Sequence, residues 1–222
     1  MNLRLLQLGD SALPIGGYSH SWGLEAAVER GLVRDAETVE LWTRAFLRFT
    51  LGPLEGVIVG AVVRSRQCAE NANQLMWASL TPTTLRNASR DMGEQLLSLA
   101  ATWEWAKDFL LPPYPGRGEG RTSQWHHAVV FACLAGGAGA TPREAIALYL
   151  HQAALGVISA GVRGIPIGHT HGQQILTRLH DDIAELAGAL CDKPLETAGS
   201  NCPAYEILCY EQSRLYTRIF RS

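Results

Sequence analysis

A helix-start signal at Thr141-Pro142-Arg143-Glu144 constrains the fold of this chain more than any other stretch of its sequence. A threonine followed three residues later by a glutamate can form a reciprocal capping box, and proline is favoured at the first helical position. The helix that follows, Arg143 to about Val162, is apolar on almost every side. Because a helix that is hydrophobic all round must be buried, we predict that it forms the centre of a helical bundle or reaches a contact with another subunit.

Helix signals recur along the rest of the chain, whereas strand signals are weak. The apolar spacing and capping residues predict further helices over residues 18–30 (closed by Gly31), 35–49, 54–68, 81–110, 173–190 and 205–220. The β-branched runs at 57–63 and 129–131 do not alternate, and no Asn-Gly or Asp-Gly turn separates candidate strands. We therefore predict an all-α fold, a single helical-bundle domain of about seven to ten helices. Residues 1–190 would form its helical body, and residues 191–222 a hinge and a dependent C-terminal arm. The turn-rich stretch from Pro112 to Gly120 is expected to be a mobile loop.

Composition excludes several classes of protein. The 222 residues are 47% hydrophobic and 18% charged, with a formal net charge of −2, which is incompatible with a disordered chain or a general affinity for nucleic acid. Five scattered cysteines without a C-x-x-C pair favour free thiols in a reducing cytosol. No secretory signal is recognisable, and the most apolar stretch, residues 145–167, is interrupted by polar side chains. We expect a cytoplasmic protein without a membrane span.

The basic residues are unusual in kind, since 17 are arginine and only Lys107 and Lys193 are lysine. Arginine forms planar, bidentate contacts that suit interfaces. A GC-rich genome would produce the same bias. Both explanations stay open at the level of sequence.

Two short motifs could bind a ligand. Residues 10–21 contain Gly16 and Gly17 just before Tyr18 and Ser19, so backbone N–H groups there could hold an anion, although a simple turn before a helix explains the same residues. His169 and His171 form an H-x-H pair, with His180 further on, which could clasp a metal ion in a loop. On a helix, however, residues two apart diverge, and packing or an exposed polar patch is the simpler interpretation.

The end of the chain, residues 214–222, interleaves Tyr216, Ile219 and Phe220 with arginines. This composition is typical of an interface anchor, but a terminal helix docked on its own domain would have it too. No motif combines a nucleophile, a base and an orienting group. A helical metal-dependent hydrolase is therefore disfavoured, and we predict a protein without enzymatic activity.

Four strings of residues, in order from residue 5 to residue 222, resemble the urease accessory protein F (UreF) family. They are Leu5-Leu6-Gln7-Leu8-x-Asp10-Ser11-Ala12-Leu13-Pro14-Ile15-Gly16-Gly17-Tyr18-Ser19-His20-Ser21, Leu85-Arg86-x-Ala88-Ser89-Arg90-x-Met92-Gly93, the stretch from Ala160 to Leu176, and Tyr216-Thr217-Arg218-Ile219-Phe220-Arg221-Ser222. The chain departs from the family pattern at His169 and His171. It also departs at Tyr210-Glu211, which lies two positions before the place of the family's His-Glu pair.

The resemblance implies a non-catalytic, cytoplasmic, homodimeric scaffold without a cofactor. Family members bind the UreD accessory protein (UreH in some organisms), recruit the GTPase UreG and so deliver nickel to the urease apoprotein. The alternative is a metallochaperone that binds nickel directly through His169 and His171. The residues to which the resemblance assigns partner binding are Gly16, Gly17, Tyr18, Ser19, Arg163, Gln173, Gln174, Tyr216, Arg218 and Phe220.

Overall fold

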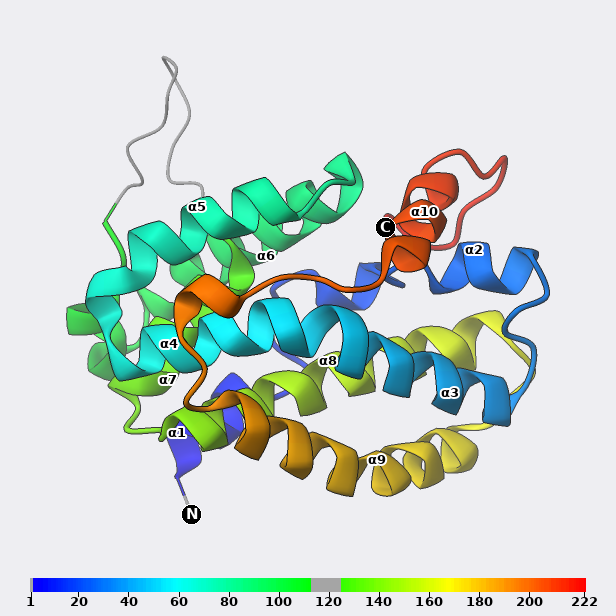
Figure 1. The fold of residues 1–222 in the computed structure, drawn as a ribbon. Helices are drawn as coiled ribbons and strands as arrows, with labels where there is room; N and C mark the ends of the chain where they lie inside the picture. The colour runs from blue at the N-terminus through cyan, green and yellow to red at the C-terminus, as the bar shows by residue number, and fades with distance from the viewer. Residues whose placement is uncertain (1, 113–124) are drawn as a thin grey trace.

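The protein folds as one bundle of α-helices in the computed structural model, which describes residues 2–112 and 125–222 (Figure 1). No β-strand occurs in those two ranges, so the prediction of an all-α fold is confirmed. The ten α-helices of the described residues are α1 (Leu3–Leu8), α2 (Leu24–Glu29), α3 (Ala36–Phe46), α4 (Val57–Arg64), α5 (Ala69–Ser79), α6 (Thr83–Ala100), α7 (His127–Gly137), α8 (Pro142–Gly164), α9 (His169–Leu190) and α10 (Pro203–Gln212).

Both strong capping signals act as the sequence predicts. The Thr141 hydroxyl accepts a hydrogen bond from the Glu144 N–H at 3.3 Å, while the Glu144 carboxylate accepts the Thr141 N–H at 2.8 Å. At the start of α3, Asp35 and Thr38 exchange the corresponding bonds at 2.9 and 3.0 Å. These local hydrogen bonds satisfy N–H groups that the first turn of a helix leaves unpaired, and so they fix where α3 and α8 begin.

Pro53 does not separate two helices, although the sequence suggested one helix to residue 49 and another from residue 54. Residues Leu47–Gly56 adopt a π-helical segment that joins α3 to α4 without a break. A proline removes one backbone donor and crowds the preceding turn. The wider π-helical turn accommodates both effects, so the chain continues as one rod from Ala36 to Arg64.

Four other predicted helices have wrong boundaries. The expected helix over 18–30 begins only at Leu24, because Trp22 and Gly23 have left-handed backbones with φ of 56° and 82°. The helix expected over 81–110 begins at Thr83, after an extended Pro82, and ends at Ala100. It is followed by a 3₁₀ segment, Glu104–Phe109.

The third of these helices lies near the end of the chain, where α10 stops at Gln212 and the predicted helix to residue 220 does not form. The fourth, α9, is longer than predicted, because it begins four residues before the expected start and contains His169 and His171. The loop expected over Pro112 to Gly120 lies, from residue 113 onward, outside the described residues.

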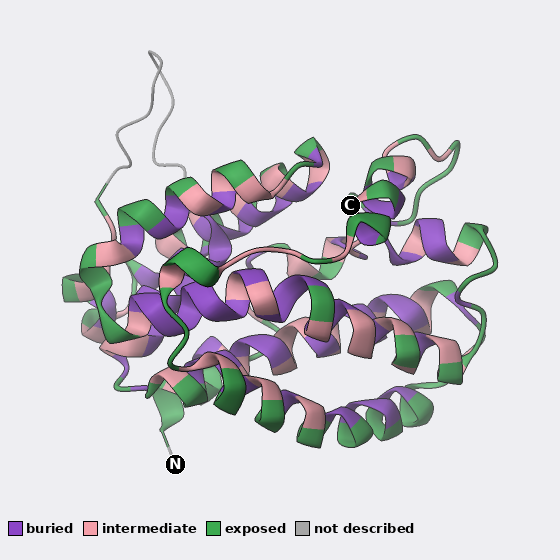
Figure 2. Cartoon of the chain, viewed as in Figure 1, coloured by how far each residue is buried: buried purple, intermediate pink, exposed green. Residues whose placement is uncertain are grey.

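The helix without an exposed face is α7, in which every residue from 127 to 135 is buried. It contacts α1, α4, α5, α6 and α8, so neighbours enclose it on all sides. The predicted central helix, α8, packs against α2, α3, α4, α7 and α9, but half of its most apolar stretch is only partly buried. Figure 2 shows the buried faces of the helices turned inward and the exposed stripes of α5 and α9 turned outward. The core therefore has two central helices, and α7 is the more deeply buried.

Two helical stretches, Ala36–Arg64 and Pro142–Gly164, are long and apolar enough to cross a membrane by length and composition alone. The sequence had excluded a span near Pro142–Gly164 on its polar interruptions, and that argument was insufficient. Within the bundle the two stretches pack against each other through α4 and α8, and α8 also contacts α9. Their apolar side chains are thus used for helix packing in this fold.

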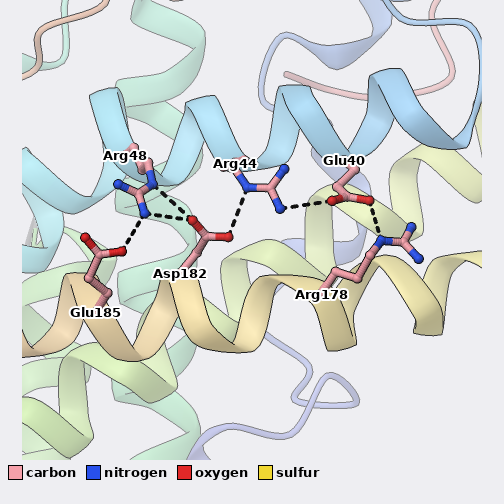
Figure 3. A network of polar contacts seen from close by, with 6 residues as sticks. All are labelled: Glu40, Arg44, Arg48, Arg178, Asp182 and Glu185. Carbon is pink, nitrogen blue, oxygen red and sulfur yellow. Dashed lines mark hydrogen bonds and ion pairs between the residues drawn. The ribbon is translucent and has the colours of Figure 1, made fainter.

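Arginine holds α3 and the following π-helical segment against α9 (Figure 3). Asp182 lies between Arg44 and Arg48, which donate to it at 2.9 and 2.8 Å, and Arg48 also reaches Glu185 at 2.7 Å. Glu40 accepts in the same way from Arg44 at 2.9 Å and Arg178 at 2.6 Å. Partial burial alone would raise the pKa of Asp182, but the hydrogen bonds from Arg44 and Arg48 outweigh it and lower that pKa. Because the guanidinium group is forked, Arg44 and Arg48 can each donate hydrogen bonds to two carboxylates.

Close approach of α6 to the start of α7 depends on Gly93. A Cβ at this position would lie 2.0 Å from the backbone oxygen of Trp125, which cannot move aside as a flexible side chain would. We predict that Gly93→Ala lowers the free energy of unfolding by at least about 2 kcal/mol, measured by urea denaturation followed by circular dichroism.

Gly156→Ala, in α8, is the matched control, because a Cβ there has open space around it. That substitution should leave stability unchanged or raise it by up to about 1 kcal/mol through helix propensity. Equal effects of the two substitutions would contradict the steric explanation.

Candidate functional site

The opening motif forms an irregular turn that depends on Gly16. This residue has φ of 84°, a backbone conformation that side chains with a Cβ rarely adopt. Gly17, Tyr18 and Ser19 then form one 3₁₀ turn, and the Ser19 hydroxyl donates to the Gly16 carbonyl at 2.8 Å. The turn presents the Tyr18 ring to solvent, with 71% of its surface exposed.

The C-terminal residues return to this turn and pair with it through the backbone. Arg221 N–H donates to the Ser19 carbonyl at 2.8 Å, and the Ser222 carbonyl accepts from the N–H groups of Ser21 and Trp22 at 2.5 and 3.1 Å. The Ser222 hydroxyl also bonds to the buried His20 ring at 2.7 Å. In Figure 1 the C-terminus accordingly lies beside α2 and α10. Its hydrogen-bond partners, Ser19, Ser21 and Trp22, come from the other end of the sequence.

Glu25 in the first turn of α2 fixes the preceding part of this C-terminal tail, residues 213–222. Its carboxylate accepts the N–H groups of Ile219 at 2.6 Å and Phe220 at 3.2 Å. Helix α10, which precedes the tail in the chain, packs on α2. Glu211 near the end of α10 forms an ion pair with Arg30. Of the displaced Tyr210-Glu211 pair, Glu211 is thus part of the contact between α10 and α2, while Tyr210 is half exposed and contacts Arg214.

Arg163, at the end of α8, lies between two aromatic rings that come from two different motifs of the sequence. Its guanidinium carbon is 3.6 Å from the centre of the Tyr18 ring and 4.6 Å from the centre of the Phe220 ring. The Arg163 Nε also donates to the Ser159 carbonyl at 3.1 Å, which orients the guanidinium. Cation–π attraction therefore joins the opening motif, α8 and the tail at one point.

The tail divides into a docked part and an exposed part. Phe220 is 4% exposed, so its ring anchors the tail on its own domain, whereas Tyr216 is fully exposed and Ile219 is 69% exposed. Arg218 lies in the same exposed stretch. The sequence left two interpretations of the tail open. Phe220 is docked on its own domain, as the first interpretation expects, whereas Tyr216 is exposed and available to a partner, as the second expects.

The remaining selected residues lie elsewhere. Gln173 and Gln174 are exposed in the first two turns of α9, and His169 and His171 are exposed at the start of the same helix. Being two apart on a helix, the histidines point in different directions. Across the described ranges, no three histidine, cysteine, aspartate or glutamate side chains gather as a metal site would require. A metal role for His169 and His171 stays a prediction.

A cavity of about 310 Å³ extends inward from Tyr18 and Arg163. Glu55 and Tyr149 lie deep in its wall: the Tyr149 hydroxyl donates to the Glu55 carboxylate and contacts the His127 ring at 3.3 Å. Burial raises the pKa of Glu55 to about 7, although the Tyr149 hydrogen bond opposes this shift. Glu55 was not among the residues selected from the sequence, where its signal is a single acidic residue within the apolar stretch from Leu51 to Val63.

These features define an all-α protein whose candidate site is built from glycine, aromatic and arginine residues and is suited to contact another molecule. A sequence profile of the UreF family matches residues 33–180. Over 99% of its length the chain is 30% identical to urease accessory protein UreF of Corynebacterium efficiens and 33% identical to that of an Arthrobacter species, in each case covering 96% of the relative. It is 32% identical to the UreF of Cupriavidus metallidurans, with 99% and 97% of the two chains covered.

The chain therefore belongs to the UreF family of urease accessory proteins, as its motifs indicated, and its role lies in urease maturation. The profile match ends before the tail and begins after the opening motif, whereas the alignments to whole relatives include both.

We predict that Arg163→Ala loosens the tail. Loss of the two ring contacts should cost about 1–2 kcal/mol, which corresponds to about a five- to thirtyfold faster hydrogen exchange at Ile219, Phe220 and Arg221, measured by mass spectrometry. Arg218→Ala is the matched control, because that side chain lies in the exposed stretch of the tail. Unchanged exchange in the Arg163 variant would show that the backbone bonds alone hold the tail.

Docking of the tail should also weaken in acid through His20. Burial and, to a smaller extent, Arg221 lower the pKa of His20 from 6.5 to about 4, although Asp91 opposes the shift. A docked pKa below the ordinary 6.5 means that the contribution of His20 to docking is fully present above pH 6.5 and is lost as the pH falls toward 4. At pH 5 the loss should be at most about 2 kcal/mol.

The measurement is exchange protection of the tail at pH 7 and pH 5, corrected for intrinsic exchange and compared with the protection of α7. In His20→Gln the ring no longer titrates, so the pH dependence confined to the tail should disappear. A tail that keeps full protection at pH 5 in the unsubstituted protein would contradict the role of His20.

Proposed function

We propose that this protein is a non-catalytic, cytoplasmic scaffold of urease maturation. In this proposal it forms a homodimer, binds the UreD/UreH accessory protein and recruits the GTPase UreG, so that the complex delivers nickel to the urease apoprotein. Family membership supports the maturation role, and the character of the candidate site supports the scaffold. The site offers aromatic and arginine side chains, which are enriched in protein interfaces.

The observation that carries the proposal is the exposure of apolar side chains around the docked tail. Four large residues on α10 and the tail are half exposed or more: Ile207, Tyr210, Tyr216 and Ile219, which we call the C-terminal apolar surface. Exposing them to water is unfavourable unless a partner covers them. Because Glu25 bonds to Ile219 and Phe220, and Ser222 is bonded to Ser21 and Trp22, the Ile219 end of this surface is held in place before a partner arrives. A preorganised surface loses less entropy on binding.

Separate contacts are proposed for the other selected residues. Gln173 and Gln174 are exposed in the first two turns of α9. In this proposal they contact a second partner while the tail binds the first. Gly16 and Gly17 act indirectly in this proposal, because they set the turn that holds Tyr18 and accepts the tail. This arrangement would let one subunit bring two proteins together.

The proposal is tested by the double variant Tyr216→Ser/Ile219→Ser. Both side chains are exposed, so the fold should persist, while affinity for the UreD/UreH protein, measured by calorimetry or co-purification, should fall at least about tenfold. Leu3→Ser/Leu6→Ser is the matched control, since it removes two exposed apolar side chains of α1, at the other terminus.

In cells that depend on the accessory proteins, the tail variant should also leave urease with little activity while the α1 variant should not. Binding and maturation that survive the loss of Tyr216 and Ile219 would overturn the proposed role of the C-terminal apolar surface. Turnover of any substrate by the isolated protein would overturn its non-catalytic nature.

A further inference from the structure

Two histidines that are far apart in the sequence face each other across the pair of helices α8 and α9. His151 projects from α8 and His180 from α9, and the two helices pack closely against one another (Figure 1). The ring centres are 5.8 Å apart, and the ring planes are inclined by 32°. His151 is half-buried and His180 is exposed, so the pair lies at the surface with one ring partly sheltered.

Neither imidazole is used by the fold. Within the described ranges the two rings contact each other, and neither ring forms a hydrogen bond or an ion pair. The other half-buried or buried histidines differ in this respect: His20 bonds to Ser222, His126 to Ser89 and His127 to Tyr149. The ring nitrogens of His151 and His180 are therefore free to take a ligand.

The spacing suits a shared metal ion. When two imidazole nitrogens each lie about 2.0–2.1 Å from one ion, with an angle between them somewhat wider than tetrahedral, the two ring centres are about 5–6 Å apart. The observed 5.8 Å falls in this range. His169 and His171 lack this advantage, because on α9 their side chains diverge.

The surroundings of the pair also suit a metal ion. Burial and the neighbouring His180 both lower the pKa of His151, so the site disfavours a proton on that ring. Two adjacent imidazoles offer nitrogen ligands without the carboxylate oxygens that Mg²⁺ and Ca²⁺ prefer.

We propose that His151 and His180 form a two-imidazole binding site for a borderline divalent transition-metal ion such as Ni²⁺, Cu²⁺ or Zn²⁺. Imidazole pairs select these ions over the alkaline earths. Among the described residues no third histidine, cysteine or carboxylate joins the pair, so water fills the other coordination positions. A site with two protein ligands is open and exchanges its ion readily, unlike a closed four-ligand structural site.

The site goes beyond the scaffold function and does not depend on it, since the isolated protein should bind the metal without any partner. The test is calorimetric titration of the full chain with Ni²⁺ at pH 7.5. One equivalent should bind saturably with Kd below about 1 mM, and His151→Gln and His180→Gln should each weaken that binding at least about tenfold. The double variant His169→Gln/His171→Gln is the matched control and should bind as the unsubstituted protein does.

A second readout identifies the ligands directly. In the complex with Cu²⁺, electron paramagnetic resonance should show coupling to two imidazole nitrogens, and each single variant should remove one of them. A tenfold excess of Mg²⁺ should displace nothing. Circular dichroism checks that the variants, which alter surface side chains, remain folded.

Several results would overturn the site. They are the absence of saturable binding below 1 mM Ni²⁺, binding unchanged in both single variants, or binding lost in the His169/His171 variant instead, which would place the metal on the H-x-H pair. None of these outcomes affects the binding of the UreD/UreH protein by the C-terminal apolar surface, so the failure of one proposal is distinguishable from the failure of the other.

Discussion

A helix without a polar face has to be enclosed by other helices, and the complete burial of α7 is the constraint on which the rest of the bundle depends. Helices α4, α6 and α8 surround it most closely, and small residues let them approach. Gly93 lets α6 approach the Trp125 carbonyl, and Gly137 at the end of α7 leaves room for the ring of Phe109. Because this core is assembled from helices on both sides of the undescribed segment, neither half of the chain could bury its apolar residues alone.

On this core the two ends of the chain are brought together. The opening motif supplies a left-handed glycine turn, α8 supplies Arg163, and the tail supplies Phe220. Backbone hydrogen bonds to Ser19, Ser21 and Trp22 then fix the tail, and Glu25 fixes it from the side. Part of the apolar tail is thereby used inside the molecule, and the rest is presented at a defined place. A scaffold needs such an arrangement, because a contact surface that is already ordered binds a partner at a lower entropic cost.

Arginine is used here as a structural connector as well as a surface charge. Arg44 and Arg48 each serve two carboxylates between α3 and α9, and Arg163 stacks between two rings. Lysine, with a compact ammonium group, could not make either kind of contact as well. A genomic bias can supply arginine codons, but it does not arrange guanidinium groups in this way. The interactions within the chain thus account for several of the arginines that the sequence suggested for interfaces.

Features that depend on neighbouring residues could be predicted from the sequence: the capped starts of α3 and α8, the all-α class, and the family. Capping boxes and helical periodicity are local, so Thr141-Pro142-Arg143-Glu144 acts in the same way in a short peptide as in the fold. Packing between distant segments determines that the rod continues through Pro53, that α7 rather than α8 is fully enclosed, and that the tail is not helical. It also determines that Arg163 meets Tyr18 and Phe220, that Glu55 lies beside Tyr149, and that His180 faces His151 rather than His171. The physical reason is that these contacts join residues many positions apart. Their partners are chosen by how whole helices pack, which no short stretch of sequence specifies.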